Sequence, residues 1–524
     1  MSNTTAAGPG RLRGPTPAKA PEPQQSERPP AFALRPVLVV AVLTGVVLLV
    51  TGARYGFHRD ELYHVLLGDR LAWGYADTGP ASALLSHLGV SLFGAHAWAV
   101  RVPSALLTTG TVVVVALLAR ELGGRSRAQV LAAAATAASA FTLIIGHVFL
   151  TTSIDEPLTL LVVLFAIRAL RRADGRWWLA AGAVTGLAWY NKYVVVLTVL
   201  SLAVGLVLAG PRTVFRDRYL WGGAVAAAVV GLPNLLYQAT HDFVALDMAS
   251  GIAAFHGDAD RAGILLSQLT LAGPLLVPVW VAGLVRLFRD RSVRAVAVAY
   301  PAYLAFMLLT GPRPDYIYPL MLVALAAGCV SIDGWWSERR VLQILVGAGF
   351  ALSAMYAVLV SLPVIPAGSL ATSPTVDSKL FPVQAQLVAD QVGWPDYVKE
   401  VNEVYQGLPP AERAHTVILT GNYGEAGAIY LLGREYDLPA VYSGHNGLYS
   451  YGPPPQAATT VIFTYIVDPA QRSHLLPAFD RCYLAGRVSN RYQVPNEEVG
   501  VPIEVCTGLH GSWSQIWPAL KHLD

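Results

Sequence analysis

A dense cluster of ionisable side chains follows the first long apolar segment of the chain. His58, Arg59, Asp60 and Glu61 are consecutive, and His64 follows one helical turn later. Charged groups beside or inside a bilayer are energetically costly and tend to mark function. A carboxylate in such a place can act as a general base that takes the proton from an attacking hydroxyl group. We therefore take Asp60 as the candidate base and Glu61 as its catalytic partner.

Further polar side chains lie at the ends of other apolar segments. A phosphate leaving group needs cations or hydrogen-bond donors as its negative charge develops. The candidate groups that bind this phosphate are His58, Arg59, Lys192, Arg313 and Tyr316. The candidate groups that hold an acceptor molecule are the carboxylates of Glu61, Asp77, Asp155 and Glu156. Together these side chains predict a site for displacement of a lipid-linked phosphate.

Each of these residues also has an ordinary structural interpretation. Asp60 can pair with Arg54 in a solvated loop, where ion pairs contribute little. The acidic pair 155–156 can occupy the first turn of a helix and complement its dipole. Lys192 can extend toward the membrane interface, and Arg313, between two prolines, can mark a rigid turn. The functional interpretation therefore depends on the whole set of residues.

The composition is that of a polytopic membrane protein. Of the 524 residues, 54% are hydrophobic and only 14% are charged, whereas soluble proteins carry roughly 25% charged residues. The net charge of +3 gives no support for nucleic-acid binding, which needs a concentrated basic face. About eleven transmembrane helices are expected by the length criterion. They fall near 36–53, 102–119, 129–147, 154–170, 177–189, 193–209, 220–237, 263–285, 295–310, 316–332 and 341–362.

The distribution of Lys and Arg predicts the orientation of these helices. Basic residues are abundant in the N-terminal tail and in every second connection between apolar segments, and sparse in most of the others. Since basic residues favour the cytoplasmic side, residues 1–35 form a disordered cytoplasmic tail in a protein of the cytoplasmic membrane. Residues 36–363 then form the transmembrane domain. Its first outer loop, 54–101, is an exception with several arginines, and all the candidate site residues fall on the outer side.

Residues 364–524 have shorter apolar runs and more polar residues, which predicts a small extracytoplasmic α/β domain. The expected helices are 377–405 and 425–435, and the expected buried strands are 416–420 and 459–466. The turn-like segments 422–425 and 443–446 are either ordinary loops or parts of the site. Cys482 and Cys506 both lie in this domain, and an oxidising exterior permits a disulfide between them.

The order of several short motifs resembles that of family 39 glycosyltransferases. This family comprises membrane enzymes of the GT-C fold and includes protein O-mannosyltransferases and lipid A aminoarabinose transferases. The residues that carry the resemblance are Tyr55–Tyr63, Trp73–Pro80, Arg101–Ala105, Ala119–Gly124, Thr152–Glu156, Asn191–Tyr193, Pro233–Leu235 and Gly311–Tyr316, with Asn422–Ala426 and Ser443–Asn446 in the outer domain. The resemblance covers most of the membrane part.

The resemblance implies transfer of a sugar from a polyprenyl-phosphate-linked donor outside the membrane, with inversion at the anomeric carbon. Asp60 matches the family's catalytic carboxylate, Glu61 its acceptor-side partner and Asp155 its second outer acidic position. The chain departs from bacterial members at Gly79, where they often have proline, and at Arg313, where they have lysine. An arginine still binds phosphate. Some relatives bind a divalent cation near the carboxylates, but the sequence requires no cofactor.

The sequence leaves several alternatives open. The donor sugar is mannose or another hexose or pentose, and the acceptor is a protein, a glycan, a glycolipid or a natural product. A transporter or lipid flippase is a rival interpretation, because Pro274, Pro278 and Pro301 interrupt apolar segments. A second rival is a catalytically silent scaffold that presents its outer domain to a partner.

Overall fold

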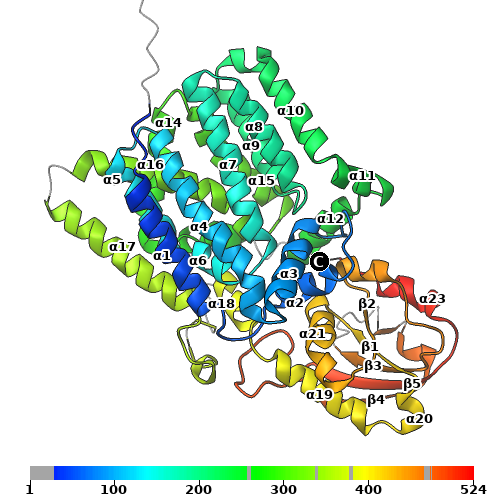
Figure 1. Ribbon diagram of the computed structural model, residues 1–524. Coiled ribbons are helices and arrows are strands. Elements are labelled where there is room, and N and C mark those ends of the chain that lie inside the picture. Colours follow the sequence, from blue (N-terminus) through cyan, green and yellow to red (C-terminus); the bar gives the residue numbers. More distant parts are fainter. Residues whose placement is uncertain are drawn as a thin grey trace, which may run out of the picture.

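The computed structural model describes residues 29–256, 261–336, 340–373, 375–376, 382–464, 472–473 and 475–523. Most of the predicted N-terminal tail therefore lies outside the described residues. A large helical part is followed by a smaller part that contains a β-sheet, and the two meet along one side (Figure 1). The prediction that the boundary between two domains falls at residue 363 stays a prediction.

The helical part places every predicted apolar segment on a helix or on a bent pair of helices. The helices are α1 (Leu34–Thr51), α4 (Ala97–Glu121), α5 (Ser126–Ala137), α6 (Ala140–His147), α7 (Thr151–Arg172), α8 (Arg176–Ala188), α9 (Val195–Ala209), α10 (Arg218–Val230), α11 (Leu232–Thr240), α12 (Val244–His256), α13 (Arg261–Thr270), α14 (Val277–Arg289), α15 (Arg294–Thr310), α16 (Tyr318–Trp336) and α17 (Arg340–Ser361). Among the described residues, 4 helices are long and apolar enough to cross a membrane, or up to 7 if each bent pair is one span. The chain is thus a multi-pass membrane protein, while eleven spans stay a prediction.

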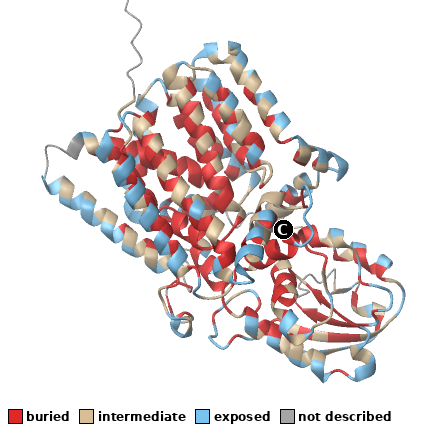
Figure 2. Cartoon of the chain, in the orientation of Figure 1, coloured by how far each residue is buried: buried red, intermediate tan, exposed pale blue. Residues whose placement is uncertain are grey.

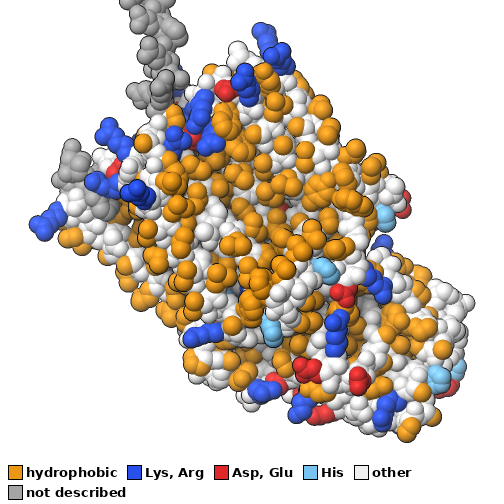
Figure 3. Space-filling view, in the orientation of Figure 1, with side chains coloured by type: hydrophobic (Ala, Val, Ile, Leu, Met, Phe, Trp, Pro, Cys, Tyr) orange, Lys and Arg blue, Asp and Glu red, His pale blue; other side chains and the backbone are white. Residues whose placement is uncertain are grey.

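Burial differs strongly between the centre and the rim of the bundle. In the most apolar 18-residue segment of each helix, the buried share is 83% for the helix that includes α16, but only 28% for α1 and 17% for α17. The rim helices therefore turn apolar side chains outward (Figure 2), as expected of helices that face lipid tails. Lys and Arg side chains gather at the end of the bundle away from the β-sheet, beyond a broad apolar surface (Figure 3).

The predicted outer loop 54–101 contains two helices that sequence analysis missed, α2 (Arg59–Gly68) and α3 (Pro80–Phe93). His58 caps α2 in a reciprocal arrangement with Glu61, and Pro80 begins α3, where its missing N–H costs nothing. A Cβ atom on Gly79 would lie 2.2 Å from the carbonyl oxygen of Tyr190. Gly79, one of the departures from the bacterial pattern, therefore permits α3 to pack closely against the connection after α8.

The smaller part is built on a five-stranded mixed sheet in the order β2-β1-β3-β5-β4. Its strands are β1 (Thr416–Thr420), β2 (Val441–Ser443), β3 (Thr460–Thr464), β4 (Phe479–Arg487) and β5 (Pro502–Leu509). Strand β1 is parallel to β2 and β3, whereas β5 is antiparallel to β3 and β4. The predicted disulfide is present, because Cys482 and Cys506 are bonded across β4 and β5.

Two helix predictions for this part need correction. The single helix expected at 377–405 is wrong: α18 (Pro382–Ala389) and α19 (Trp394–Gly407) are separated at Gly393, whose φ of +105° cannot continue a helix. Residues 377–381 lie outside the described residues, as do 465 and 466 of the second predicted strand. The helix expected at 425–435 is α21 (Tyr423–Leu432), followed by a 3₁₀ turn.

Candidate active site

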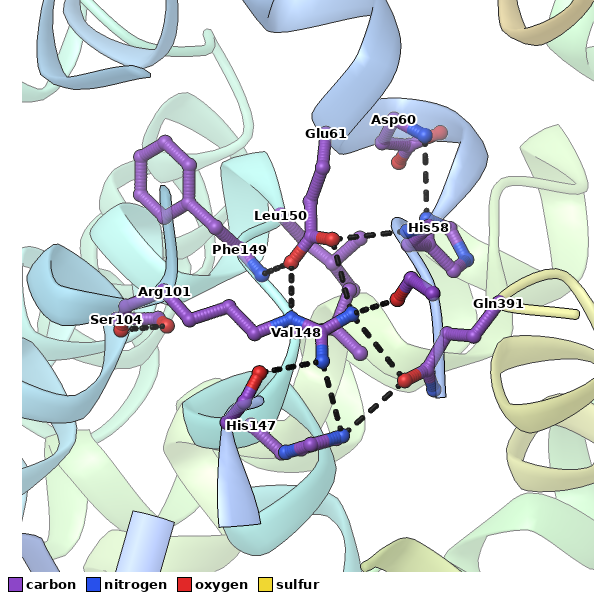
Figure 4. Close-up of polar contacts among 12 residues, drawn as sticks. His58, Asp60, Glu61, Arg101, Ser104, His147, Val148, Phe149, Leu150 and Gln391 are labelled. Carbon is purple, nitrogen blue, oxygen red and sulfur yellow. Dashed lines mark hydrogen bonds and ion pairs between the residues drawn. The ribbon is translucent and has the colours of Figure 1, made fainter. Parts of the chain in front are cut away.

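Asp60 lies in the first turn of α2, beside the junction of the two parts. Its side chain is partly exposed, and its Oδ1 accepts a hydrogen bond of 2.9 Å from the hydroxyl of Tyr423, at the start of α21. Its backbone N–H donates to Nδ1 of His58 at 3.1 Å, as Figure 4 shows. The helix N-terminus also favours a negative charge at this position.

The surroundings of Asp60 keep its carboxylate ionised. Burial acts to raise the pKa of Asp60, but the nearby imidazoles and the guanidinium groups of Arg59 and Arg313 lower it to about 2. Burial in turn lowers the pKa of His58 to about 3 and that of His64 to about 4. At neutral pH the site therefore holds a carboxylate anion beside neutral imidazoles and fixed cations.

Glu61 is adjacent in sequence but has a different environment. Its side chain is fully buried, and Arg101 binds both carboxylate oxygens, at 2.8 and 3.0 Å. The backbone N–H groups of Phe149 and His58 donate to the same carboxylate at 2.9 and 2.8 Å. With four donors already bound, Glu61 has no exposed oxygen for an acceptor. The geometry therefore contradicts a catalytic or acceptor-binding role for Glu61 and gives it a structural one.

Arg101 is a residue whose importance sequence analysis missed. Its guanidinium group also donates to the carbonyl oxygens of Gly52 and Gly56, at 3.0 and 2.7 Å, and to Oε1 of Gln391 at 3.2 Å. The same oxygen of Gln391 lies 3.1 Å from Nε2 of His147. One buried cation thus joins the end of α1, the start of α2, the end of α6 and Gln391, which lies two residues after α18 (Figure 4).

The side chains of His58 and Arg59 lie against residues of the C-terminal part, and their role in phosphate binding stays a prediction. The imidazole of His58 is buried with Nε2 3.9 Å from Asp390. Arg59 forms an ion pair with Glu497, and its Cζ lies 4.9 Å from the centre of the Tyr423 ring. Both side chains therefore contact the C-terminal part, because α2 packs directly against it.

Lys192, Arg313 and Tyr316 lie near one another, and Arg313 lies within electrostatic reach of Asp60. The ammonium group of Lys192 lies 5.3 Å from the centre of the Tyr316 ring. The side chain of Arg313 is 40% exposed, and its Nε lies 3.4 Å from Oδ1 of Asp315. The positive charge of Arg313 lowers the pKa of Asp60, which places it within electrostatic reach of the carboxylate. Lys192 and Arg313 are therefore partly exposed cations, whereas the hydroxyl of Tyr316 is buried.

The three remaining acidic candidates lie at different depths. Asp77 accepts a hydrogen bond of 2.7 Å from the hydroxyl of Tyr63, and burial raises its pKa to about 6. Asp155 is buried and accepts a hydrogen bond of 2.7 Å from the side-chain amide of Asn191. It therefore lies deeper in the protein than the exposed part of the site. Neither oxygen of Glu156 has a hydrogen-bond partner in the described ranges, and its side chain is buried in the helical core. Glu156 therefore has no surface on which to hold an acceptor.

No group of three or more His, Cys, Asp or Glu residues among those the structure describes is arranged to hold a metal ion. A divalent cation near the carboxylates accordingly stays a prediction. Tyr423 is a functional candidate that sequence analysis only approached, by noting that segment 422–425 could face the site. The sequence feature that could have identified Tyr423 is a tyrosine hydroxyl at the start of a helix.

Comparisons with known proteins test the fold and the family resemblance. Residues 77–237 match the family model described as dolichyl-phosphate-mannose-protein mannosyltransferase. No curated protein matches the chain. The crystal structures of ArnT from Cupriavidus metallidurans, in the apo state and bound to undecaprenyl phosphate, superpose with a TM-score of 0.56 at 15% identity, over 91% of this chain and 99% of ArnT.

A third similar structure is the arabinofuranosyltransferase AftD from Mycobacteria. It has a TM-score of 0.47 and 15% identity, and the match covers 93% of this chain but 41% of AftD. The superposition on ArnT and the matched segment confirm the resemblance to GT-C membrane glycosyltransferases. The predicted fold class is thereby confirmed for the helical bundle with its small C-terminal sheet.

Proposed function

We propose that this protein is an inverting glycosyltransferase that moves a sugar from a polyprenyl-phosphate-linked donor to an acceptor hydroxyl outside the membrane. The observation that carries the proposal is the partly exposed, ionised carboxylate of Asp60 beside Lys192 and Arg313. A base and a phosphate-binding pair are the two groups that this reaction needs at one place. The fold shared with ArnT supports the assignment.

The reaction then follows from the positions of these groups. Asp60 takes the proton of the acceptor hydroxyl as the acceptor oxygen forms a bond to the anomeric carbon of the sugar. The bond from that carbon to the lipid phosphate breaks, and its electron pair stays on the phosphate oxygen. Lys192 and Arg313 stabilise the charge that appears there. Because attack and departure occur on opposite faces, the anomeric configuration inverts.

The donor and acceptor are assigned only by class. One ArnT structure is bound to undecaprenyl phosphate, which supports a polyprenyl phosphate as the lipid carrier here. The sugar is mannose or another hexose or pentose. The acceptor is a protein, a glycan, a glycolipid or a natural product.

The proposal also includes an orientation in the cytoplasmic membrane. Basic side chains gather at the end of the bundle away from the sheet (Figure 3), and such residues favour the cytoplasm. The N-terminus is then cytoplasmic, and Asp60 and the C-terminal domain lie outside. Accessibility of an introduced cysteine at Ser450, tested with a membrane-impermeant reagent in intact cells, checks this orientation.

The decisive experiment measures transfer of labelled sugar in membranes that contain the wild type, Asp60→Asn or Asp69→Asn. Polyprenyl-phosphate-mannose is the first donor, followed by other hexose and pentose donors. Asp69 at the other end of α2 is the matched control. Transfer by the wild type and Asp69→Asn, lost in Asp60→Asn, supports the proposal. Solute or lipid flux into reconstituted vesicles without a glycosidic product would instead favour the transporter interpretation.

A further inference from the structure

We infer that the C-terminal α/β domain is part of the catalytic unit and that Tyr423 is a positioning residue for the base. This inference rests on the proposed function, since it concerns the same carboxylate. Tyr423 opens α21, and its hydroxyl donates to Oδ1 of Asp60 at 2.9 Å. A carboxylate with one oxygen held in this way presents its other oxygen, Oδ2, in a fixed direction to the acceptor hydroxyl.

The ring of Tyr423 is held by several neighbours, so the direction of its hydroxyl is defined. The rings of Tyr63 and His445 lie 4.7 and 4.8 Å away, centre to centre. The guanidinium carbon of Arg59 lies 4.9 Å from the ring centre. The backbone N–H of Tyr423 donates to Nδ1 of His445 at 3.2 Å. Burial raises the pKa of Tyr423 well above its ordinary value, so the hydroxyl keeps the proton that it donates.

Two glycines bring α21 against α2 and so bring Tyr423 to Asp60. A Cβ atom on Gly424 would lie 2.7 Å from Cβ of Arg59, and one on Gly427 would lie 2.6 Å from the carbonyl group of Leu62. The spacing of three residues places both glycines on the face of α21 that meets α2. Any side chain at either position would push the two helices apart.

The first turn of α21 is also rigid. Asn422 caps the helix, and its side chain accepts the N–H of Glu425 at 2.9 Å. Oε2 of Glu425 accepts in return from the N–H groups of Gly421 and Asn422 and from the hydroxyl of Thr464, at 3.1, 3.3 and 3.2 Å. The start of α21 is thus tied to the end of β3, and the sheet supports the position of Tyr423.

The first test is the rate of sugar transfer by Tyr423→Phe, with Tyr449→Phe as the control. Tyr449 belongs to the same domain, but its ring stacks on Trp517. A hydrogen bond to a charged group predicts that kcat of Tyr423→Phe falls about 10- to 100-fold. KM for the donor changes less, because no hydrogen bond joins Tyr423 to Lys192 or Arg313 among the described residues. Tyr449→Phe keeps the wild-type kcat.

A pH profile separates positioning from loss of structure. The charged and titratable groups that act on Asp60 are His58, Arg59 and His64 on α2, Asp77 before α3, Arg313 after α15, Asp390 after α18, and Tyr423. Only the last changes in Tyr423→Phe. Loss of this donor favours the protonated carboxyl, so the acid limb of kcat/KM moves to higher pH than in the wild type. A purely structural role would lower the amount of active enzyme without moving that limb.

The second test moves the whole helix. Gly427→Ala forces α21 from α2 and lowers kcat as Tyr423→Phe does, whereas Gly407→Ala, with no atom within 4 Å of the new Cβ, leaves kcat unchanged. If Tyr423→Phe keeps the wild-type kcat and the wild-type acid limb, the inference is overturned. An inactive Asp60→Asn variant would in that case still support the proposed function. Full transfer by Asp60→Asn would overturn both.

Discussion

Asp60 and Glu61 are neighbours in the chain, yet the regions around them are opposites. Around Asp60 the structure is partly open, and a tyrosine of the C-terminal domain binds one carboxylate oxygen. Around Glu61 it is closed, and four donors bind a carboxylate with no exposed surface. Successive residues of a helix point about 100° apart. One turn of α2 can therefore hold a reactive carboxylate and a structural one side by side.

The comparison teaches that an acidic pair in a sequence need not be a chemical pair. The capping interaction of Glu61 with the N–H of His58 starts α2, and its ion pair with Arg101 fixes that start against α4. Asp60 is then presented at the helix N-terminus without contributing to its anchorage. Rate and stability should accordingly respond to different members of the pair.

Asp60→Asn gives the largest expected effect on rate. Removing a general base lowers kcat about 10²- to 10⁴-fold, while the amide can still accept the hydrogen bond from Tyr423 and the fold is kept. Single-turnover transfer of labelled sugar measures the rate, and thermal unfolding of the purified protein checks the fold. An equal loss of kcat in Asp60→Asn and in Glu61→Gln, at unchanged Tm, would show that the two carboxylates do not differ in role.

Glu61→Ala gives the largest expected effect on stability. It leaves the guanidinium of Arg101 buried without its anionic partner, which costs about 3–5 kcal/mol. The control is Glu403→Ala, since Glu403 is 63% exposed in its pair with Lys399 and such a pair contributes less than about 1 kcal/mol. Denaturant unfolding in detergent measures both, and equal costs would show that the region around Glu61 is not closed.

Arg313→Ala tests whether the partly open region around Asp60 binds the lipid phosphate. Loss of a charged hydrogen bond to the lipid phosphate raises KM for the donor about 10- to 100-fold, and Arg313→Lys recovers part of this loss because the charge remains. Lys192→Ala behaves in the same way. Donor titration measures KM, and Arg481→Ala on the exposed surface of β4 is the control. A KM unchanged in all these variants would remove the phosphate-binding pair from the site.

Asp77→Asn gives the smallest expected effect on stability, and it tests the raised pKa of the Asp77 carboxyl group. Burial raises its pKa in the folded state to about 6, above the ordinary value of about 3.9 in the unfolded chain. Between these values the folded state binds more protons, so the stability contributed by Asp77 falls as pH rises from about 4 to about 6, by about 1 kcal/mol given its partial exposure. Asp77→Asn lacks this slope when Tm is measured against pH. If Asp77→Asn keeps the wild-type dependence of Tm on pH, a group other than Asp77 causes that dependence.

Much of the fold was predictable because apolar length is a strong signal. Every predicted apolar segment falls on a helix or a bent pair, and strand β1 has the predicted bounds of 416–420. Helix α2 was missed because it is short and mixed in polarity, and α3 because its apolar sequence is short. The packing of α3 depends on tertiary contacts such as that of Gly79 with Tyr190. Strands β4 and β5 were missed for a related reason, since their pattern of burial alternates irregularly.

The site was predictable in its residue types and less so in its contacts. Lys192, Arg313 and Asp77 were chosen because charges at the ends of apolar segments need a reason, and their roles stay predictions. The sequence could not distinguish Asp60 from Glu61, because the difference arises from Arg101, Phe149 and Tyr423, which are distant in the chain. The predicted roles of His58 and Arg59 stay predictions. Their neighbours Asp390 and Glu497 could not be foreseen because they come from the far C-terminal part.

The buried guanidinium of Arg101 has a consequence for how the protein is made. Helix α4 is synthesised early, but Gln391, one of the groups that satisfies its arginine, is added almost three hundred residues later. Until then a cation at the start of an apolar helix lacks part of its final coordination, and such a group is costly to leave incomplete in a bilayer. The coordination of the Arg101 guanidinium is therefore complete only when residues 290 positions apart in the chain have come together.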